Sequence, residues 1–237
     1  YDNNPYAPGL KTSWGFACLV ETGETTILFD TGGDAPTLLA NMAALDIDPL
    51  SIEIVVLSHV HGDHTGGLMG LLERSARPTV YLPRSFSDRF KARVKAAGAT
   101  VVEVDGPLEI APGLWSTGEM GTGIREQALA VRTAEGLVVI TGCAHPGVEK
   151  IVARAREVGQ GEVNLVVGGF HLGGASRNRI KSIIAEFRRL GVQRVAPCHC
   201  TGERATAMFA QEYGEAFIRC GVGRVITIGE ADLTAPP

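Results

Sequence analysis

Apolar residues recur along this chain with two different spacings. Short runs rich in β-branched residues, such as "TTILFD" and "EIVVLS", are typical of strands, whereas "APTLLANMAAL" spaces its apolar residues as a helix does. In the first half, the predicted strands are 14–21, 25–30, 53–58, 79–82 and 100–104. The predicted helices there are 35–45, 65–74 and 85–98.

The second half begins with adjacent strands and then returns to alternation. Strands are predicted at 108–118, 127–133 and 136–142, with hairpin turns at Asp105-Gly106 and Glu135-Gly136. They are followed by helix 147–159, strand 162–169, helix 176–191 and strand 193–198. Because each half has strands followed by helices, we expect two mixed sheets packed face to face, with helices on their outer faces. The predicted fold class is α/β, a four-layer αββα sandwich, formed as one domain over residues 1–237.

Composition excludes several classes of partner. With 237 residues, 45% of them hydrophobic, the chain is long enough to bury a substantial core. Basic residues number 22 against 26 acidic ones, and no long basic run occurs, so we expect no nucleic-acid partner. No segment approaches the roughly 18 consecutive apolar residues of a membrane span, so we expect no membrane partner. Five cysteines without a disulfide framework favour a reducing, cytoplasmic location.

The stretch "LSHVHGDHTGGL", residues 57–68, contains half of the chain's six histidines. Polar atoms must be paired once they are buried, so a core gives no reason to crowd imidazoles and a carboxylate together. A shared divalent cation does. His59 and His61 alternate toward one point, while the turn at Gly62 lets Asp63 and His64 face another, which suits two metal ions side by side.

The other histidines occupy equivalent places. "GCAH" with His145, "GGFHL" with His171 and "CHCTG" with His199 each follow a predicted strand, as "SHVHGDH" does. Loops at strand ends carry function in α/β folds because the sheet fixes their positions. A single histidine in such a loop is more often structural, but six in equivalent places favour a common site.

These motifs resemble the metallo-β-lactamase superfamily. "SHVHGDHTGG" matches the H-x-H-x-D-H signature of that family, and "ILFDTG" matches its second-strand motif. The resemblance implies the αββα fold, with a site at one end of the sandwich that usually binds zinc and sometimes iron or manganese. It makes His199 the family's late histidine ligand. It also implies that Asp30 supports the ligand histidines from behind, although a role in capping the turn at Gly32-Gly33 fits the residue equally well.

Two departures from the family pattern narrow the branch. Where typical members have a histidine in a "TPGHT"-like turn, this chain reads "STGEMG" with Glu119, which we expect to be a surface or turn residue. Where they have a bridging aspartate in "TGD", this chain reads "TGCAH". There Cys143 is either a bridging thiolate or a buried inert residue, and we assign it to the pocket. With "GGFHL" and "PCHCTG", this pattern resembles the branch that contains dihydropterin ribofuranosyl-aminobenzene phosphate synthases and many metal-dependent hydrolases.

The resemblance and its departures together imply the ligands of two divalent ions, with Zn²⁺ expected and Mn²⁺ or Fe as alternatives. The first ion is expected to be bound by His59, His61 and His145. The second is expected to be bound by Asp63, His64 and His199.

His171 has no counterpart among the family's usual ligands. The glycines around it allow close backbone approach, and the helix that begins near Ser176 offers an N-terminus suited to an anion. We expect a phosphate-bearing substrate to rest between His171, this helix end and Arg177 or Arg179. The alternative is a histidine that packs against a glycine-rich turn.

The residues favour metal-assisted hydrolysis of a small ester, lactone or phosphoester, in which a metal-bound hydroxide attacks. Asp63 and His171 are the catalytic candidates, with Asp63 orienting the water and accepting its proton. A second hypothesis is a transferase that condenses a pterin-methyl diphosphate with an aminobenzene ribosyl phosphate acceptor. A third is a non-catalytic metal-binding protein.

Overall fold

The computed structural model describes residues 1–23, 25–75 and 77–229, and these form two compact units. Unit 1 consists of residues 1–105 and 221–225, and unit 2 of residues 106–220 and the described residues after 225. Each unit has one β-sheet and its own hydrophobic core. The single domain and the face-to-face packing of the sheets stay predictions.

The sheet of unit 1 has the strand order β1-β2-β3-β4-β5. Its first two strands are antiparallel and the others parallel. The strands are β1 (Cys18–Glu21), β2 (Thr26–Phe29), β3 (Ile54–Val56), β4 (Thr79–Pro83) and β5 (Thr100–Val104). The helices of this unit are α1 (Ala35–Ala44), η1 (Pro49–Ser51), α2 (Gly62–Thr65), α3 (Leu68–Leu72) and α4 (Asp88–Ala96).

Local chemistry explains where the longer helices of unit 1 begin. The Asp34 side chain accepts a hydrogen bond from the Thr37 backbone at the start of α1, and Ser87 does the same for Phe90 at the start of α4. Such caps satisfy backbone N–H groups that have no partner within the helix. Strand β3 carries Val55 and Val56 fully buried, as parallel strands covered on both faces require.

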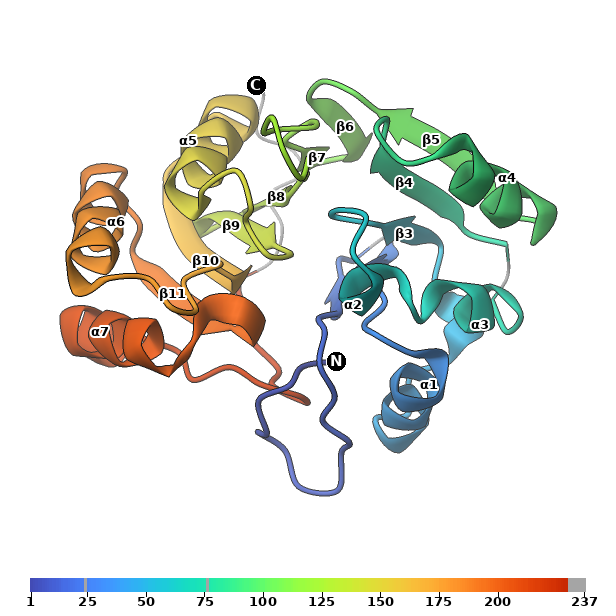
Figure 1. The fold of residues 1–237 in the computed structure, drawn as a ribbon, viewed down its shortest axis with the longest axis horizontal. Coiled ribbons are helices and arrows are strands. Elements are labelled where there is room, and N and C mark those ends of the chain that lie inside the picture. Colours follow the sequence, from blue (N-terminus) through green and yellow to red (C-terminus); the bar gives the residue numbers. More distant parts are fainter. Residues whose placement is uncertain (24, 76, 230–237) are drawn as a thin grey trace. The chain divides into compact units, whose positions relative to one another are not determined.

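The sheet of unit 2 has the order β11-β10-β9-β8-β7-β6, with β9, β10 and β11 parallel and the rest antiparallel. The strands are β6 (Leu108–Ala111), β7 (Leu114–Ser116), β8 (Leu129–Thr133), β9 (Gly136–Thr141), β10 (Val163–Gly169) and β11 (Arg194–Cys198). The helices are α5 (Val148–Gly159), α6 (Arg177–Arg189), η2 (His199–Thr201), α7 (Glu203–Tyr213) and η3 (Gly214–Ala216). In Figure 1, helices α5, α6 and α7 of this unit flank the strands β9 to β11.

The core of unit 2 includes the contact between α6 and α7, which pack together. Helix α6 buries Ile180, Ile183, Ile184 and Phe187, which is the spacing of one helical face. Phe187 and Phe209 lie with ring centroids 5.5 Å apart, within the range of favourable aromatic pairs. Both sheets are mixed and both carry helices, as the sequence predicts.

Several predicted boundaries are wrong. Asp105-Gly106 is not a hairpin turn, because β5 and β6 belong to different sheets, and the chain leaves unit 1 there. The same residue types favour a tight hairpin and a crossover, so the local signal does not separate the two. The predicted strand 108–118 is two strands joined through Gly113, whose φ of 73° lets the chain reverse. Helix α7 has no counterpart among the predicted elements.

Other local predictions hold in part. Strands β8 and β9 form the predicted hairpin, with Thr133 opposite Gly136, so its loop is Ala134-Glu135, one residue earlier than expected. Between residues 65 and 74, the predicted helix is replaced by α2, which begins earlier at Gly62, and by α3.

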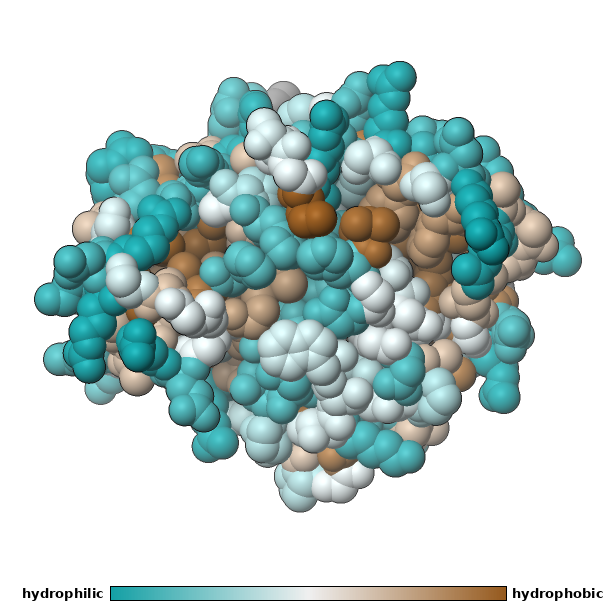
Figure 2. Space-filling view, viewed as in Figure 1, coloured by the Kyte–Doolittle hydropathy of each residue, from teal (hydrophilic) through white to brown (hydrophobic). Residues whose placement is uncertain are grey.

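The surface mixes hydrophilic residues with scattered hydrophobic ones, as the face in Figure 2 shows. The described helices include none of the length and apolar character that crossing a bilayer requires. The five cysteines, all of them among the described residues, form no disulfide with one another.

Candidate metal centre

In unit 1, the metal-binding candidates lie in the loop that follows β3. Strands β2 and β3 are parallel neighbours, so Asp30 after β2 and the "HVHGDH" loop after β3 emerge at the same sheet edge. His59 and His64 are fully buried, whereas His61 and Asp63 are partly exposed.

Asp30 organises this loop from behind. Its Oδ1 accepts a hydrogen bond from the Ser58 backbone N–H at 2.7 Å, and its Oδ2 accepts from Ser58 Oγ at 2.6 Å. The same Oδ2 lies 2.6 Å from His64 Nδ1. Because a carboxylate only accepts, His64 Nδ1 must carry the proton, which leaves the Nε2 lone pair for a metal.

Ser58 fixes the position of the proton on His59 in the same way. The single hydroxyl hydrogen of Ser58 goes to Asp30, so Ser58 Oγ must accept from His59 Nδ1, which lies 2.9 Å away. His59 therefore also presents an Nε2 lone pair. One buried carboxylate thus sets the tautomers of two candidate ligands.

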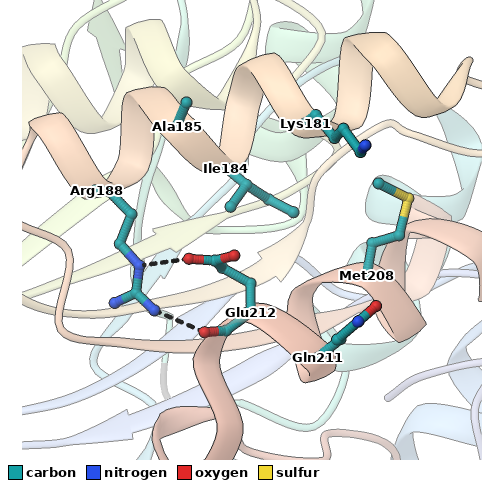
Figure 3. A pocket seen from close by; sticks show the side chains of 7 residues that line it. All are labelled: Lys181, Ile184, Ala185, Arg188, Met208, Gln211 and Glu212. Carbon is teal, nitrogen blue, oxygen red and sulfur yellow. Dashed lines mark hydrogen bonds and ion pairs between the residues drawn. The ribbon is translucent and has the colours of Figure 1, made fainter.

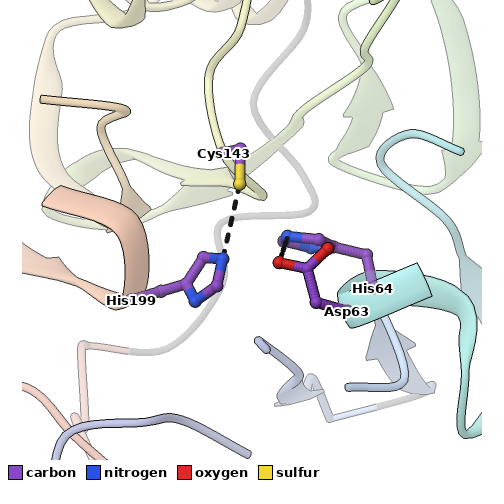
Figure 4. Close-up of side chains that lie close together, drawn as sticks. All are labelled: Asp63, His64, Cys143 and His199. Atoms are coloured by element: carbon purple, nitrogen blue, oxygen red, sulfur yellow. Dashed lines mark hydrogen bonds and ion pairs between the residues drawn. The ribbon is translucent and has the colours of Figure 1, made fainter. Parts of the chain in front are cut away.

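The nitrogen spacing in unit 1 fits a bound divalent ion. His59 Nε2 lies 3.1 Å from His61 Nδ1, and two nitrogens bound to one tetrahedral zinc lie roughly 3.3 Å apart. Asp63 Oδ2 lies 3.6 Å from His64 Nε2, a separation also close to that of two ligands on one ion. Figure 4 shows this carboxylate beside the His64 ring. Three imidazoles and a carboxylate are the donors that zinc, iron and manganese accept.

The backbone holds this arrangement in place. Thr31 donates from its N–H and its hydroxyl to the His64 carbonyl oxygen, at 2.8 and 2.9 Å. These bonds tie α2 to the loop after β2. Asp30 has a φ of 58°, a conformation that aspartate and asparagine tolerate better than most residues. Ser58 and Thr31 are not predicted as site residues, because their only signal in the sequence is their place beside "HVHGDH" and "ILFDTG".

In unit 2, the candidates follow three adjacent parallel strands. His145 comes after β9, His171 after β10 and His199 after β11. The carboxyl ends of these strands meet at one edge of the sheet, which is why residues far apart in sequence gather there. The His145 and His171 rings pack with centroids 4.3 Å apart.

Glu126 positions the loop after β9, and sequence reasoning misses it. Its fully buried carboxylate accepts hydrogen bonds from the backbone N–H groups of Cys143, Ala144 and His145, each at 2.8 Å. Three such charge-assisted bonds hold the turn that carries His145. The available signal is a glutamate placed directly before the buried run "QALAV".

Cys143 and His199 lie in contact within unit 2. Cys143 Sγ is 3.4 Å from His199 Nε2, the contact drawn as a dashed line in Figure 4. Both residues are buried. His199 has a φ of 48°, so the backbone turns sharply as β11 ends.

A second thiol, Cys200, lies beside this pair. A hydrogen bond from the Cys143 side chain, with contributions from His171 and His199, outweighs burial and lowers the pKa of Cys200 to about 5. Contact with Cys200 in turn raises the pKa of the exposed His171 imidazole. Cys200 is a neighbour that the sequence analysis does not assign to the site.

The two arginines predicted to contact an anion near α6 differ in their surroundings. Arg177 is exposed at the first turn of the helix. Arg179 instead pairs with Glu149 at 2.6 Å, and its backbone N–H is already capped by Ser176. The helix end therefore has fewer donors for a phosphate than the sequence suggests.

Glu119 lies in a bend of the chain, as one of its two predicted placements has it, but its side chain is not exposed on the surface. Its side chain is only 3% exposed and accepts from Arg125 Nη1 at 2.6 Å. The pairing keeps the carboxylate within the loop before β8.

A cavity of about 480 Å³ lies between α6 and α7 in unit 2. Figure 3 shows Arg188 at its rim, bonded to the Glu212 carboxylate and backbone. Its lining contains no residue assigned to the site: Lys181, Ile184, Ala185, Arg188, Met208, Gln211 and Glu212.

Known proteins are similar to this chain in sequence and in fold. The profile of the metallo-beta-lactamase superfamily matches residues 15–155. The chain is 31% identical to the 7,8-dihydropterin-6-methyl-4-(beta-D-ribofuranosyl)-aminobenzene-5'-phosphate synthase of Methanocaldococcus jannaschii, over 84% of this chain and 83% of the synthase. This similarity confirms the branch that "TGCAHPG" and "PCHCTG" indicate.

Solved structures agree. A metal-dependent hydrolase of the β-lactamase superfamily matches with a TM-score of 0.82 and 31% identity, over 97% of both chains. The short form of human tRNase Z matches in fold, with a TM-score of 0.58 and 17% identity over 84% of this chain and 90% of that one. The chain therefore belongs to the metallo-β-lactamase superfamily and has the metallo-β-lactamase fold.

Proposed function

We propose that this protein is a metal-dependent hydrolase of a small ester, lactone or phosphoester. The observation that carries the proposal is the Asp30–Ser58 network, which turns the Nε2 lone pairs of His59 and His64 outward from a buried carboxylate. A purely structural loop has no need to set two tautomers in this way. Membership of the superfamily supports the same chemistry.

Two divalent ions are the proposed cofactors. Zn²⁺ is the expected metal, with Mn²⁺ or Fe as alternatives. His59, His61 and His145 are proposed for one ion, and Asp63, His64 and His199 for the other. When bound, such ions activate a water molecule and stabilise charge on the leaving oxygen. The assignment rests on the family pattern and on the donors found within each unit.

The chain's own groups would orient the reactants. Asp63 is partly exposed and lies beside His64, so it can hold the attacking water and accept its proton. Arg177, exposed at the start of α6, is proposed as a contact for a phosphate on the substrate, and Cys143 as a wall of the pocket. The sequence also predicts His171 as a phosphate contact, and in the structure this imidazole lies against the Cys200 thiol.

A second candidate is group transfer. The M. jannaschii relative is named as a synthase and is similar over most of both chains. The same donors that stabilise a leaving phosphate would stabilise a leaving diphosphate, while an aminobenzene acceptor takes the place of water. The choice between the two functions therefore depends on the nucleophile.

One incubation separates the candidates. The zinc-loaded protein is given a pterin-methyl diphosphate with and without an aminobenzene ribosyl phosphate acceptor, and products are separated by chromatography. Coupled product that requires the acceptor supports transfer. Turnover on phosphodiesters, lactones or thioesters without any acceptor supports hydrolysis. Bound metal with no turnover in either arm would contradict both and support a metal-binding protein.

The metal assignment is tested by His61→Ala, with Val60→Ala as the matched control. His61 is a proposed ligand, whereas the neighbouring Val60 side chain is half exposed and offers no donor. We expect His61→Ala to lower bound metal by about one ion per chain and to abolish activity, because a three-imidazole site that loses one ligand no longer holds its ion firmly. Full metal content in His61→Ala, measured by elemental analysis, would show that the loop is structural.

A further inference from the structure

Cys143, His171 and Cys200 form a cluster within unit 2 that includes none of the six proposed ligands. We propose that these three residues bind an additional soft divalent ion, such as Zn²⁺, through two thiolates and one imidazole. The three come from the loops after β9, β10 and β11. Zinc binds sulfur and nitrogen donors of this kind, whereas magnesium and calcium prefer oxygen donors.

The donor atoms already lie close to binding distance. One atom from each residue lies within 4.8 Å of the other two. Sulfur and nitrogen ligands around one tetrahedral zinc are separated by roughly 3.5 to 3.8 Å. Closing this difference takes a movement of about 1 Å, which side-chain rotation can supply.

Backbone contacts hold the His171 and Cys200 loops together. The Gly173 N–H donates to the Cys200 carbonyl oxygen at 3.2 Å, and the Phe170 N–H donates to Thr201 Oγ1 at 3.1 Å. Cys143 is fixed separately, by the bond from its backbone N–H to Glu126. All three donors are therefore carried by segments with buried hydrogen bonds.

Gly169 makes room for the Cys200 thiol. A Cβ at this position would lie 2.7 Å from Cys200 Sγ and 2.3 Å from the Gly142 carbonyl oxygen, both closer than real Cβ atoms approach. The last residue of β10 must therefore be glycine for the thiol to reach the cluster.

The burial of the three residues differs in a way that suits a partly open site. Both thiols are buried, whereas His171 is exposed. An ion held by three protein ligands keeps a fourth position, and here that position would lie on the His171 side. Because the thiolates are the ligands, binding would release whatever protons the two thiols still carry.

Cobalt titration of the metal-free protein tests the site without relying on activity. Cobalt bound by thiolates gives a sulfur-to-metal charge-transfer absorption that cobalt bound by imidazoles and carboxylates lacks. We compare wild type with Cys200→Ser and with His171→Ala, whose exposed side chain can be removed with little risk to folding. The matched control is Cys198→Ser, because Cys198 is buried in the same segment but lies outside the cluster.

We expect Cys200→Ser and His171→Ala each to bind about one cobalt fewer than wild type, with a weaker charge-transfer band. Cys198→Ser should match wild type. The band should persist in His61→Ala, which separates this site from the proposed hydrolytic centre. Wild type without a charge-transfer band, or Cys200→Ser and His171→Ala with wild-type spectra and stoichiometry, would overturn the proposal.

Discussion

Replacing Asp30 by asparagine should reverse the proton positions on two histidines. The amide keeps the shape of the carboxylate, and asparagine tolerates the φ of 58° that Asp30 adopts. It nevertheless replaces one acceptor oxygen by a donor. An amide nitrogen at the Oδ1 position would face the Ser58 backbone N–H, a clash that cannot be relieved. At the Oδ2 position the amide nitrogen faces His64 Nδ1 and Ser58 Oγ. Both can accept its hydrogens, the histidine by changing its tautomer and the serine by rotating its hydroxyl hydrogen away.

The second orientation has a specific consequence. His64 must move its proton to Nε2, and Ser58 must donate to His59 Nδ1, so His59 also becomes protonated on Nε2. Both lone pairs are then lost on the side proposed for the metals. Losing the partner behind a metal-binding histidine lowers metal affinity by about 10- to 100-fold. The substitution also removes the negative charge from the group that makes three buried hydrogen bonds. The loss of these charge-assisted bonds should lower the free energy of unfolding by roughly 2 to 4 kcal/mol.

Long-range ¹H–¹⁵N spectra of the metal-free protein report the two tautomers directly, and competition with a chromogenic chelator reports zinc affinity. Asp48→Asn serves as the control, because Asp48 caps an exposed turn by accepting from Leu50, a role that asparagine fills equally well. Wild-type tautomers together with wild-type zinc affinity in Asp30→Asn would refute the network reasoning.

Two further predictions concern unit 2. Glu126→Gln should lower the free energy of unfolding by about 2 to 4 kcal/mol in chemical denaturation, because at least one of the three backbone N–H groups then faces an amide donor. The control is the surface change Glu186→Gln, which should have little effect. Burial raises the pKa of Tyr213 to about 12 from an ordinary value near 10, so stability from this group is present below pH 10 and is lost as the pH rises through 12. Tyr213→Phe should remove that alkaline loss without lowering stability at pH 7, since the buried hydroxyl makes no hydrogen bond within the described residues; a lower stability at pH 7 would contradict this.

The local features of this protein can be predicted from short stretches of its sequence. β-Branched runs marked most strands because their side chains suit buried parallel strands, as Val55 and Val56 illustrate. The "HVHGDH" loop predicts metal binding because its donor residues lie close together in the chain. Family membership followed from motifs of the same kind.

Contacts between residues far apart in the chain are visible only in the folded structure. Asp30 and Ser58 are 28 residues apart, and Cys143 and Cys200 are 57 apart, yet each pair is in contact. Local propensity cannot predict such pairs, because they depend on which parallel strands become neighbours and on the edge at which their loops emerge. Glu126 stayed hidden for the same reason, since its partners are backbone N–H groups that carry no signature in the sequence.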